Sequence, residues 1–344
     1  MKRILLIKPC CIGDVIFATP LLAALRRAYP NAHITWAVNT SIAPVLYEHP
    51  HLNAVLELGE SANPAAPCRL LGFVRQIGRL GADAVFVPDR SRWYSLATRL
   101  ARIPMRVGLN SGGRGFAYTH KAAVQPEAIR HEAEVYLDLA RLLGIPTDGL
   151  WAFAPLSVQA AVQAERFLHE AHLAHGGYLV IHPGGGVNVG MRLIEKRWPA
   201  ENFAALAERL AERLKAQIAV IGAASDREAV ARFKAALKQP CLDWSERFSL
   251  AEIAALAVRA ALYIGNDNGV GHLAAAAGAK VLMIFGPTDP RRYAPFVPPE
   301  RARYAWRPIA LPKGGVSGGA PRHFDWARDG VSVEEAFAIA CALC

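Results

Sequence analysis

Residues 262–290 read LYIGNDNGVGHLAAAAGAKVLMIFGPTDP, and this stretch decides the fold. An apolar strand at 262–265 leads into a polar turn with Asp267 and two glycines, and an alanine-rich helix follows at once. A second apolar strand at 281–285 ends in the rigid turn Gly286-Pro287-Thr288-Asp289. Two short buried strands joined by a helix predict parallel neighbours in a sheet that helices cover on both faces.

The same alternation of strands and helices occurs twice along the chain. We expect strands in the first half at 4–7, 33–38, 54–58 and 84–87, and in the second half at 178–182, 218–222, 262–265 and 281–285. These two patterns predict an α/β protein with two Rossmann-like domains that face each other across a ligand-binding cleft. We place the first domain at 1–155 and the second at 156–320, and we expect a C-terminal helix within 321–344 that packs back on the first domain.

The composition is that of a cytoplasmic protein with two buried cores. Apolar residues make up 53% of the 344 residues, and the longest apolar stretches fall short of the roughly 20 residues that a membrane helix needs. The apolar run at the start of the chain ends at Lys8, which favours a buried strand over a signal peptide. The six cysteines lack a repeated metal-ligand spacing, so we expect reduced, structural thiols and no bound metal.

The net charge is +10, and the excess of basic residues is uneven along the chain. Between Ala66 and Lys121 the acidic residues are only Asp83 and Asp89, against many arginines. Such a surface either binds an anionic partner or is simply solvated, and both interpretations stay open. Nucleic acid is not expected, because the chain has no zinc-finger spacing, RNP-like aromatic motif or basic coiled coil.

Several segments after predicted strands have the character of a diphosphate site. The turn and helix start at 266–272 direct backbone N–H groups and the positive helix end at one point, although Asp267 or Asn268 could instead be a plain N-cap. The glycines of 182–186, HPGGG, let a ligand approach the backbone closely. This motif is neither G-x-G-x-x-G nor a Walker A loop, which argues against hydride transfer and ATP hydrolysis. Lys196, nearby in sequence, is suited to neutralise a leaving diphosphate.

The loop after the first strand, KPCCIGD at 8–14, ends in Asp14. A carboxylate at the carboxyl end of this strand lies toward the expected cleft, where it suits a general base. An ordinary helix N-cap is the alternative interpretation.

Together these segments resemble the ADP-heptose heptosyltransferase family of lipopolysaccharide core assembly. The resemblance rests on ILLIKPCCIGDVIFATPLLAALRRAYP at 4–30, on IHPGGG at 181–186 with EKRWPAENFAALAERL at 195–210, and on YIGNDNGVGHLAAAAGAKVLMIFGPTDPRRYAPF at 263–296. It implies an inverting glycosyltransferase of GT-B type, with two facing Rossmann-like domains. It also implies ADP-heptose as the donor, a lipid-linked inner-core oligosaccharide as the acceptor, and no essential cofactor or metal.

The resemblance implies roles for individual residues. Asp14 matches the general base, with Gly13 before it, and Lys196 matches the lysine at the donor phosphates. Asp226 falls at the ribose and Phe248 near the adenine. The other donor-binding positions are Gly184, Asp267, Asn268, Gly269, His272, Thr288 and Asp289. Asn268 departs from the family's usual Ser or Thr, and Gly271 replaces a bulkier residue. The acceptor's acidic groups are expected to meet Arg90, Arg92 and Arg114.

Two other functions stay open on the sequence alone. One is a nucleotide-sugar epimerase of the same fold, which would change the donor sugar with no acceptor present. The other is a non-catalytic protein that binds an anionic glycan or nucleic acid. The basic surface also leaves open a peripheral contact with the cytoplasmic face of the inner membrane.

Overall fold

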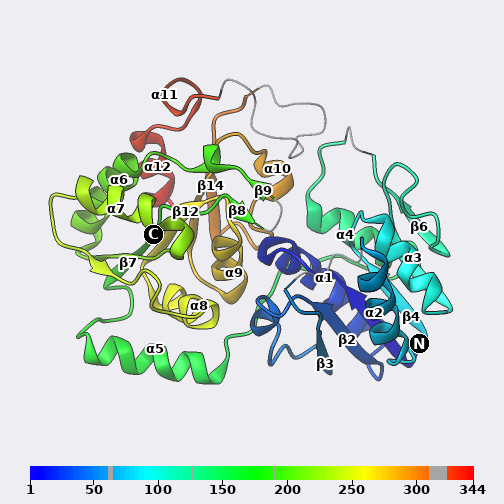
Figure 1. Ribbon diagram of the computed structural model, residues 1–344. Coiled ribbons are helices and arrows are strands. Elements are labelled where there is room, and N and C mark those ends of the chain that lie inside the picture. Colours follow the sequence, from blue (N-terminus) through cyan, green and yellow to red (C-terminus); the bar gives the residue numbers. More distant parts are fainter. Residues whose placement is uncertain (61–64, 126–127, 189–190, 310–323) are drawn as a thin grey trace. The chain divides into compact units, whose positions relative to one another are not determined.

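The computed structural model describes residues 1–60, 65–125, 128–188, 191–309 and 324–344. The chain forms two α/β units, Met1–Pro155 and Leu156–Cys344 (Figure 1). Each unit is built on a six-stranded sheet whose paired strands are all parallel. The prediction of two Rossmann-like α/β units is confirmed.

The sheet of the first unit has the strand order β3-β2-β1-β4-β5-β6. Its strands are β1 (Arg3–Ile7), β2 (His33–Val38), β3 (Ala54–Glu57), β4 (Ala84–Val87), β5 (Met105–Asn110) and β6 (His120–Ala123). The connecting helices are α1 (Ile12–Ala28), the short η1 (Ala43–Val45), α2 (Pro67–Gly78), α3 (Arg92–Leu100) and α4 (Glu132–Arg141). Helix α1 packs against α4, and α2 packs against α3. Because the strand order reverses at β1, where the chain crosses from β3 to place β4 on the other side of β1, these two pairs cover opposite faces of the sheet.

Strands β5 and β6 were not among the sequence-based predictions. The sequence of β5, MRVGLN, is interrupted by Arg106 and Gly108. The Arg106 guanidinium donates hydrogen bonds to the carbonyls of Ile103 and Ala117, so tertiary contacts satisfy a charge that would otherwise oppose a strand here. Gly108 leaves room for the ring of Tyr118, which a Cβ would meet at 2.2 Å. Contacts from a later segment therefore complete this strand.

The second unit repeats the topology with the order β11-β10-β7-β12-β13-β14. Its strands are β7 (Tyr178–His182), β10 (Gln217–Val220), β11 (Leu242–Asp243), β12 (Leu262–Asn266), β13 (Val281–Ile284) and β14 (Ala302–Ala305), and a separate hairpin pairs β8 (Val187–Asn188) with β9 (Met191–Arg192). Its helices are α5 (Val158–Glu170), η2 (Ile194–Lys196), α6 (Ala200–Leu214), η3 (Ala224–Asp226), α7 (Arg227–Ala236), α8 (Leu250–Arg259), α9 (Gly269–Ala277), α10 (Pro290–Tyr293), α11 (Trp326–Asp329) and α12 (Val333–Cys341).

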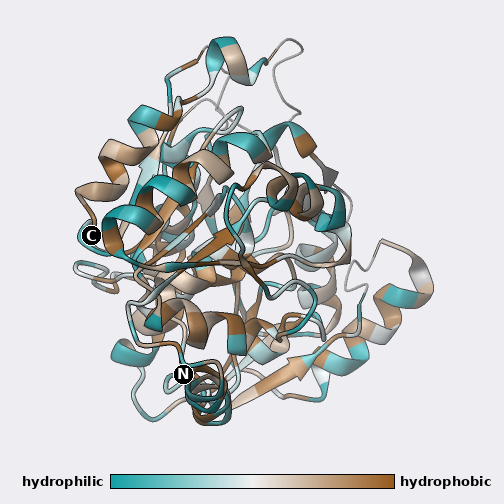
Figure 2. Ribbon diagram, turned by 90° about the vertical axis from the view of Figure 1, so that its left-hand side faces the viewer, coloured by the Kyte–Doolittle hydropathy of each residue, from teal (hydrophilic) through white to brown (hydrophobic). Residues whose placement is uncertain are grey.

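Helices of the second unit form two groups. Helix α6 packs against α7 and α12, whereas α8 packs against α5 and α9 (Figure 1). The helices carry both apolar and polar residues, as expected for elements with one face on a sheet and one in solvent (Figure 2). The core between sheet and helices includes Phe203, Phe233 and Ile264, all fully buried. Burial of this apolar area is the main stabilising term for the unit.

The C-terminal helix differs from its prediction. Ala336, Ala340 and Leu343 are buried in the core of the second unit, where α12 packs against α6, β13 and β14. The apolar side of α12 is thus used within the second unit, and the expectation that this helix packs on the first domain is wrong. The part of the expected segment at 321–323 lies outside the described residues.

Cys10 and Cys11 form a disulfide, which contradicts the expectation of six reduced cysteines. Cys10 and Cys11 are adjacent, so their sulfurs lie close together whether or not they are bonded. Their spacing in the sequence therefore does not tell a pair of thiols from a disulfide. The cysteines at 68, 241, 341 and 344 are free thiols. Among the helices that the structure describes, none combines the length and the apolar character needed to cross a membrane.

The strand order predicts where a ligand would bind. In each unit the order reverses beside the first strand, between β1 and β4 and between β7 and β12. At such a switch point the loops at the carboxyl ends of the two strands diverge to opposite faces and leave a crevice. The sequence motifs at 8–14, 182–186 and 266–272 all follow one of these strands.

Candidate active site

In the first unit, Asp14 lies in the first turn of α1, directly after the loop that follows β1. The N-cap residue of α1 is Cys11, which makes no side-chain capping bond. The alternative that Asp14 is itself an N-cap is therefore wrong, and a carboxylate in the first turn is favoured by the positive helix end. Gly13, also in this turn, is partly exposed.

Both oxygens of the Asp14 carboxylate have a neighbour. The Tyr136 hydroxyl, from α4, donates a hydrogen bond to Oδ1 over 3.1 Å. The Lys8 ammonium lies 3.5 Å from Oδ2 and 3.2 Å from an oxygen of Asp89, which follows β4. The Asp14 side chain remains 37% exposed, so it can still meet a ligand from the solvent side. Sequence reasoning did not assign Lys8, Asp89 or Tyr136, although the first two follow strands at the switch point.

The three arginines expected at the acceptor differ in what they already bind. Arg90 Nη2 donates hydrogen bonds to both carboxylate oxygens of the buried Glu132. Arg92 is exposed and stacks on the ring of Trp93, and Arg114 is exposed with hydrogen bonds to Ser111. All three follow the carboxyl ends of β4 or β5, the same edge of the sheet as Asp14.

In the second unit, the loop after β7 places three glycines against other elements. A Cβ on Gly184 would meet the Asp226 carboxyl carbon at 2.2 Å, and one on Gly186 would meet the Leu193 carbonyl oxygen at 2.4 Å. Gly185 has φ +99°, a conformation that side chains disfavour. The main reason for glycine at position 184 is therefore the close approach of Asp226 to the loop. Exposure of the backbone to a ligand is a secondary reason.

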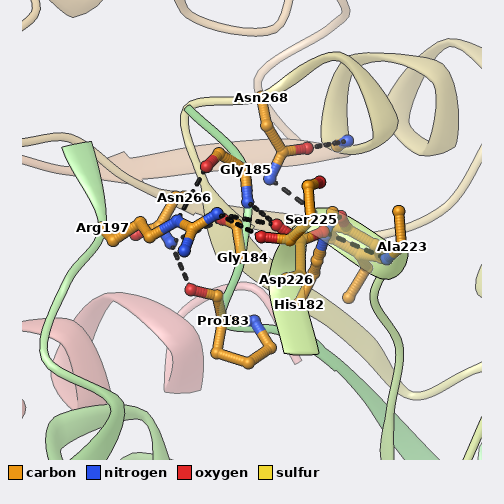
Figure 3. Close-up of polar contacts among 12 residues, drawn as sticks. His182, Pro183, Gly184, Gly185, Arg197, Ala223, Ser225, Asp226, Asn266 and Asn268 are labelled. Atoms are coloured by element: carbon orange, nitrogen blue, oxygen red, sulfur yellow. Dashed lines mark hydrogen bonds and ion pairs between the residues drawn. The ribbon is translucent and has the colours of Figure 1, made fainter. Parts of the chain in front are cut away.

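Asp226 lies beneath this loop and is only 3% exposed (Figure 3). Its Oδ1 accepts hydrogen bonds from the Gly185 N–H and from Arg197, each at 2.9 Å. Its Oδ2 accepts from the Ala223 N–H at 3.1 Å and contacts His182 Nε2 at 3.3 Å. Burial alone would raise the pKa of Asp226, but His182 and the two backbone donors hold it well below its usual value. This arrangement contradicts a direct contact of Asp226 with the ribose, because the carboxylate is buried and its acceptor sites are occupied.

Two asparagines connect the glycine loop to α9. Asn266, fully buried at the end of β12, donates to the carbonyls of Pro183 and Gly184 (Figure 3). Asn268 is the N-cap of α9, and its Oδ1 accepts from the Gly271 N–H. The N–H groups of Gly269 and Val270, in the first turn, have no acceptor within the helix. Free N–H groups at a helix start suit an anion, and anion binding at this helix start stays a prediction.

Lys196 is held at the same site by a carboxylate. Its ammonium lies 2.6 Å from Asp267 Oδ2, which also accepts a hydrogen bond from the Thr288 hydroxyl at 2.8 Å. His272 Nε2 lies 3.5 Å from the other oxygen of Asp267. Burial alone would raise the pKa of Asp267, but Lys196 and His272 hold it well below its usual value. Asp267 and Thr288 thus orient Lys196, and the four predicted residues form one cluster.

Asp289 does not belong to this cluster. It is fully buried and caps α10, accepting hydrogen bonds from the Arg291 backbone and guanidinium. Direct contact with a donor is therefore excluded, because no surface of Asp289 reaches solvent. Phe248 is partly exposed and packs edge-on against Phe167 and Trp244, with Arg247 over its ring. It remains a candidate for the adenine.

Sequence reasoning missed Arg197, Asn266 and the role of His182. A signal for Asn266 was present, because an amide at the end of a fully apolar strand has to be satisfied by hydrogen bonds. Arg197 gave no such signal, since an arginine before a helix is ordinarily exposed. Across the described ranges, no group of three or more His, Cys, Asp or Glu side chains is arranged to hold a metal ion.

Comparison with known sequences adds the family. The profile of glycosyltransferase family 9 (heptosyltransferase) matches residues 71–305, more than half of the chain. The chain is 26% identical to lipopolysaccharide heptosyltransferase 2 of Escherichia coli strain K12 over 311 residues, which cover 86% of this chain and 85% of that protein. It is also 26% identical to lipopolysaccharide heptosyltransferase 1 of Pseudomonas aeruginosa, over 84% of this chain and 79% of that protein.

Solved structures share the fold. A glycosyl transferase family 9 protein from Veillonella parvula superimposes with a TM-score of 0.82 at 23% identity, covering 99% of this chain and 97% of its own. The ADP-heptose lps heptosyltransferase II of E. coli superimposes with a TM-score of 0.74 at 23% identity, covering 99% of both chains.

Proposed function

Because the chain belongs to glycosyltransferase family 9, the heptosyltransferases, we propose that it transfers a heptose from ADP-heptose to a hydroxyl group of the lipopolysaccharide inner core. Its homologues named above are lipopolysaccharide heptosyltransferases. The observation that carries the proposal is the cluster in the second unit, where a glycine loop, the start of α9 and an oriented lysine meet at one switch point. This combination suits a diphosphate.

The donor binds to the second unit in this proposal. Its diphosphate accepts hydrogen bonds from the N–H groups of Gly269 and Val270 and contacts the Lys196 ammonium. As the bond to the anomeric carbon breaks, negative charge grows on the phosphate oxygen, and a preorganised cation and helix end stabilise that charge. Lys196 and the helix start supply this stabilisation from the protein itself, so we propose that no divalent metal or cofactor takes part.

The acceptor binds to the first unit, where Asp14 acts as the general base. The acceptor hydroxyl gives its proton to the Asp14 carboxylate while its oxygen attacks the anomeric carbon of the heptose. The bond to ADP breaks in the same step, and the configuration inverts. Arg92 and Arg114 bind acidic groups of the acceptor, because both residues are exposed and follow strands at the same edge as Asp14. Arg90, already paired with Glu132, shapes this surface.

A lipid-linked acceptor brings the enzyme to the cytoplasmic face of the inner membrane. The exposed Arg75, Arg79, Arg99 and Arg102 on and after α2 and α3 support a peripheral contact with anionic lipid. Flotation with vesicles that contain phosphatidylglycerol checks this contact, and vesicles of phosphatidylcholine alone serve as the control. Equal recovery with both would exclude an electrostatic contact.

The test of the reaction uses purified chain, ADP-heptose and truncated inner-core acceptors, with release of ADP and the mass of the product as readouts. We expect transfer, and for Asp14→Asn a turnover lower by about 10²- to 10⁴-fold with donor affinity retained. Undiminished turnover in this variant refutes the base. A donor sugar that changes without any acceptor would instead identify an epimerase, and donor binding without transfer would identify a binding protein.

A further inference from the structure

The buried ammonium of Lys8 contacts two carboxylates, those of Asp14 and Asp89. Lys8 is almost fully buried, with its Nζ 3.2 Å from Asp89 and 3.5 Å from Asp14. Burial alone would lower the pKa of Lys8, but Asp14, Tyr136 and Asp89 raise it well above its usual value. Its two carboxylate neighbours therefore favour the charged form of Lys8.

A buried hydroxyl holds the other side of Asp14. Tyr136 comes from α4 and donates to Asp14 Oδ1, whereas Lys8 lies beside Oδ2. Burial raises the pKa of Tyr136 well above its usual value, so its hydroxyl remains a donor. Two groups from different elements thus fix the plane of the carboxylate. This leaves its exposed side for the acceptor.

Two further charged side chains near Tyr136, those of Glu132 and Arg90, neutralise each other. Glu132, from α4, and Arg90, after β4, both act on Tyr136, and they form an ion pair of 2.8 Å. Asp89 also accepts a hydrogen bond from the Ser91 N–H, which fixes its position after β4. Lys8 and Tyr136 contact Asp14 directly, and Asp89 contacts Lys8.

A cation beside a carboxylate favours its ionised form and so weakens it as a base. Lys8 makes its shorter contact, a hydrogen bond, with Asp89 rather than with Asp14. We propose that Lys8, Asp89 and Tyr136 are positioning residues for Asp14, in which Tyr136 orients the carboxylate and Asp89 limits the effect of Lys8 on its basicity. This inference rests on the proposed role of Asp14 as the base.

The experiment measures kcat/KM against pH for Lys8→Met, Asp89→Asn and the wild type. Removing the cation disfavours ionised Asp14, so we expect Lys8→Met to move the acid limb to higher pH by about one unit or more. Removing the competing carboxylate leaves Lys8 to act on Asp14 alone, so Asp89→Asn should move this limb to lower pH. If the acid limb of the pH profile does not move in either folded variant, or moves in the same direction in both, the proposal is overturned.

Tyr136→Phe provides a test that does not remove a buried charge. We expect kcat to fall about ten-fold or more with the KM for the donor unchanged, because a hydrogen bond to a charged group is lost. Tyr118→Phe is the matched control: Tyr118 is equally buried in the first unit, and its hydroxyl has no hydrogen-bond partner among the residues described. Equal kcat in the two variants contradicts the positioning role, even if Lys8→Met does not fold.

Asp14→Asn separates this inference from the proposed function. If Asp14→Asn keeps full turnover and the acid limb, the base is wrong and the inference fails with it. If Asp14→Asn is impaired but the variants of its neighbours keep the wild-type profile and turnover, only the positioning inference fails.

Discussion

Replacing Asp226 should destabilise the second unit itself, whether or not a ligand is bound. The carboxylate accepts hydrogen bonds from the N–H groups of Gly185 and Ala223 and from Arg197, and it contacts His182. In Asp226→Ala the Arg197 guanidinium loses its partner charge in a largely buried place. Removing one partner of a buried ion pair costs about 3–5 kcal/mol, and the two backbone donors lose their acceptor as well. We therefore expect the free energy of unfolding to fall by about 3–5 kcal/mol.

The assay is urea unfolding of the whole chain, combined with hydrogen exchange of peptides covering 178–188 and 220–230. Faster exchange in these two segments places the effect at the glycine loop. Asp243→Asn is the matched control in the same unit, because Asp243 forms an exposed ion pair with Lys234. Exposed pairs contribute about 0–1 kcal/mol, so this variant should unfold almost like the wild type.

The opposite outcome has a clear meaning. If Asp226 faced the ribose, Asp226→Ala would leave unfolding of the ligand-free chain unchanged and weaken only the binding of ADP, measured by calorimetry. Unchanged unfolding with weaker ADP binding would therefore refute the structural role of Asp226 and restore the ribose contact predicted from sequence.

Three further predictions concern the donor site and the first sheet. Lys196→Met should lower kcat/KM for ADP-heptose by about 10²- to 10³-fold, since a cation at the leaving group is lost, and normal kinetics would remove that role. The pKa values of Asp226 and Asp267 are lowered in the folded state, so the stability that these carboxylates contribute is present above the ordinary carboxyl pKa of about 4 and is lost as the pH falls below it. Thermal unfolding measured against pH should show this loss, and the loss should be smaller in Asp267→Asn. Gly108→Ala should destabilise the first unit by about 1–3 kcal/mol, because a Cβ would meet the Tyr118 ring at 2.2 Å; an unchanged denaturation midpoint would contradict this.

Most of both sheets could be predicted from the sequence, because their strands are short apolar runs bounded by turns. The strands from β1 to β4, and β7, β10, β12 and β13, all have this form. Strand β5 contains Arg106 and Gly108, and it becomes a strand only because Ala117 and Tyr118 return to cover those residues. Ala117 lies 11 residues beyond Arg106, outside the short run of residues whose pattern identifies a strand.

The position of the candidate site was predictable, but the direction of its side chains was not. Parallel sheets bring the carboxyl ends of their strands to one edge, so Asp14, Asp267 and the glycine loop had to lie at the switch points. Whether a carboxylate there faces a ligand or a protein donor depends on donors from other elements. Asp226 accepts a hydrogen bond from Arg197, a residue that sequence reasoning did not assign, so this acceptor is used within the protein.

Carboxylates paired with cations also explain why net charge is a poor guide to the donor site. Lys196 is balanced by Asp267, and Arg197 by Asp226, so neither adds an uncompensated charge. Each pair instead restricts a long side chain whose ordering would otherwise cost up to about 2 kcal/mol when a ligand binds. The excess of basic residues is greatest between Ala66 and Lys121, in the first unit, whereas the proposed site in the second unit relies on oriented N–H groups and a fixed ammonium. Binding of the donor should therefore depend less on salt than binding of an anionic acceptor, because geometry rather than net charge selects the diphosphate.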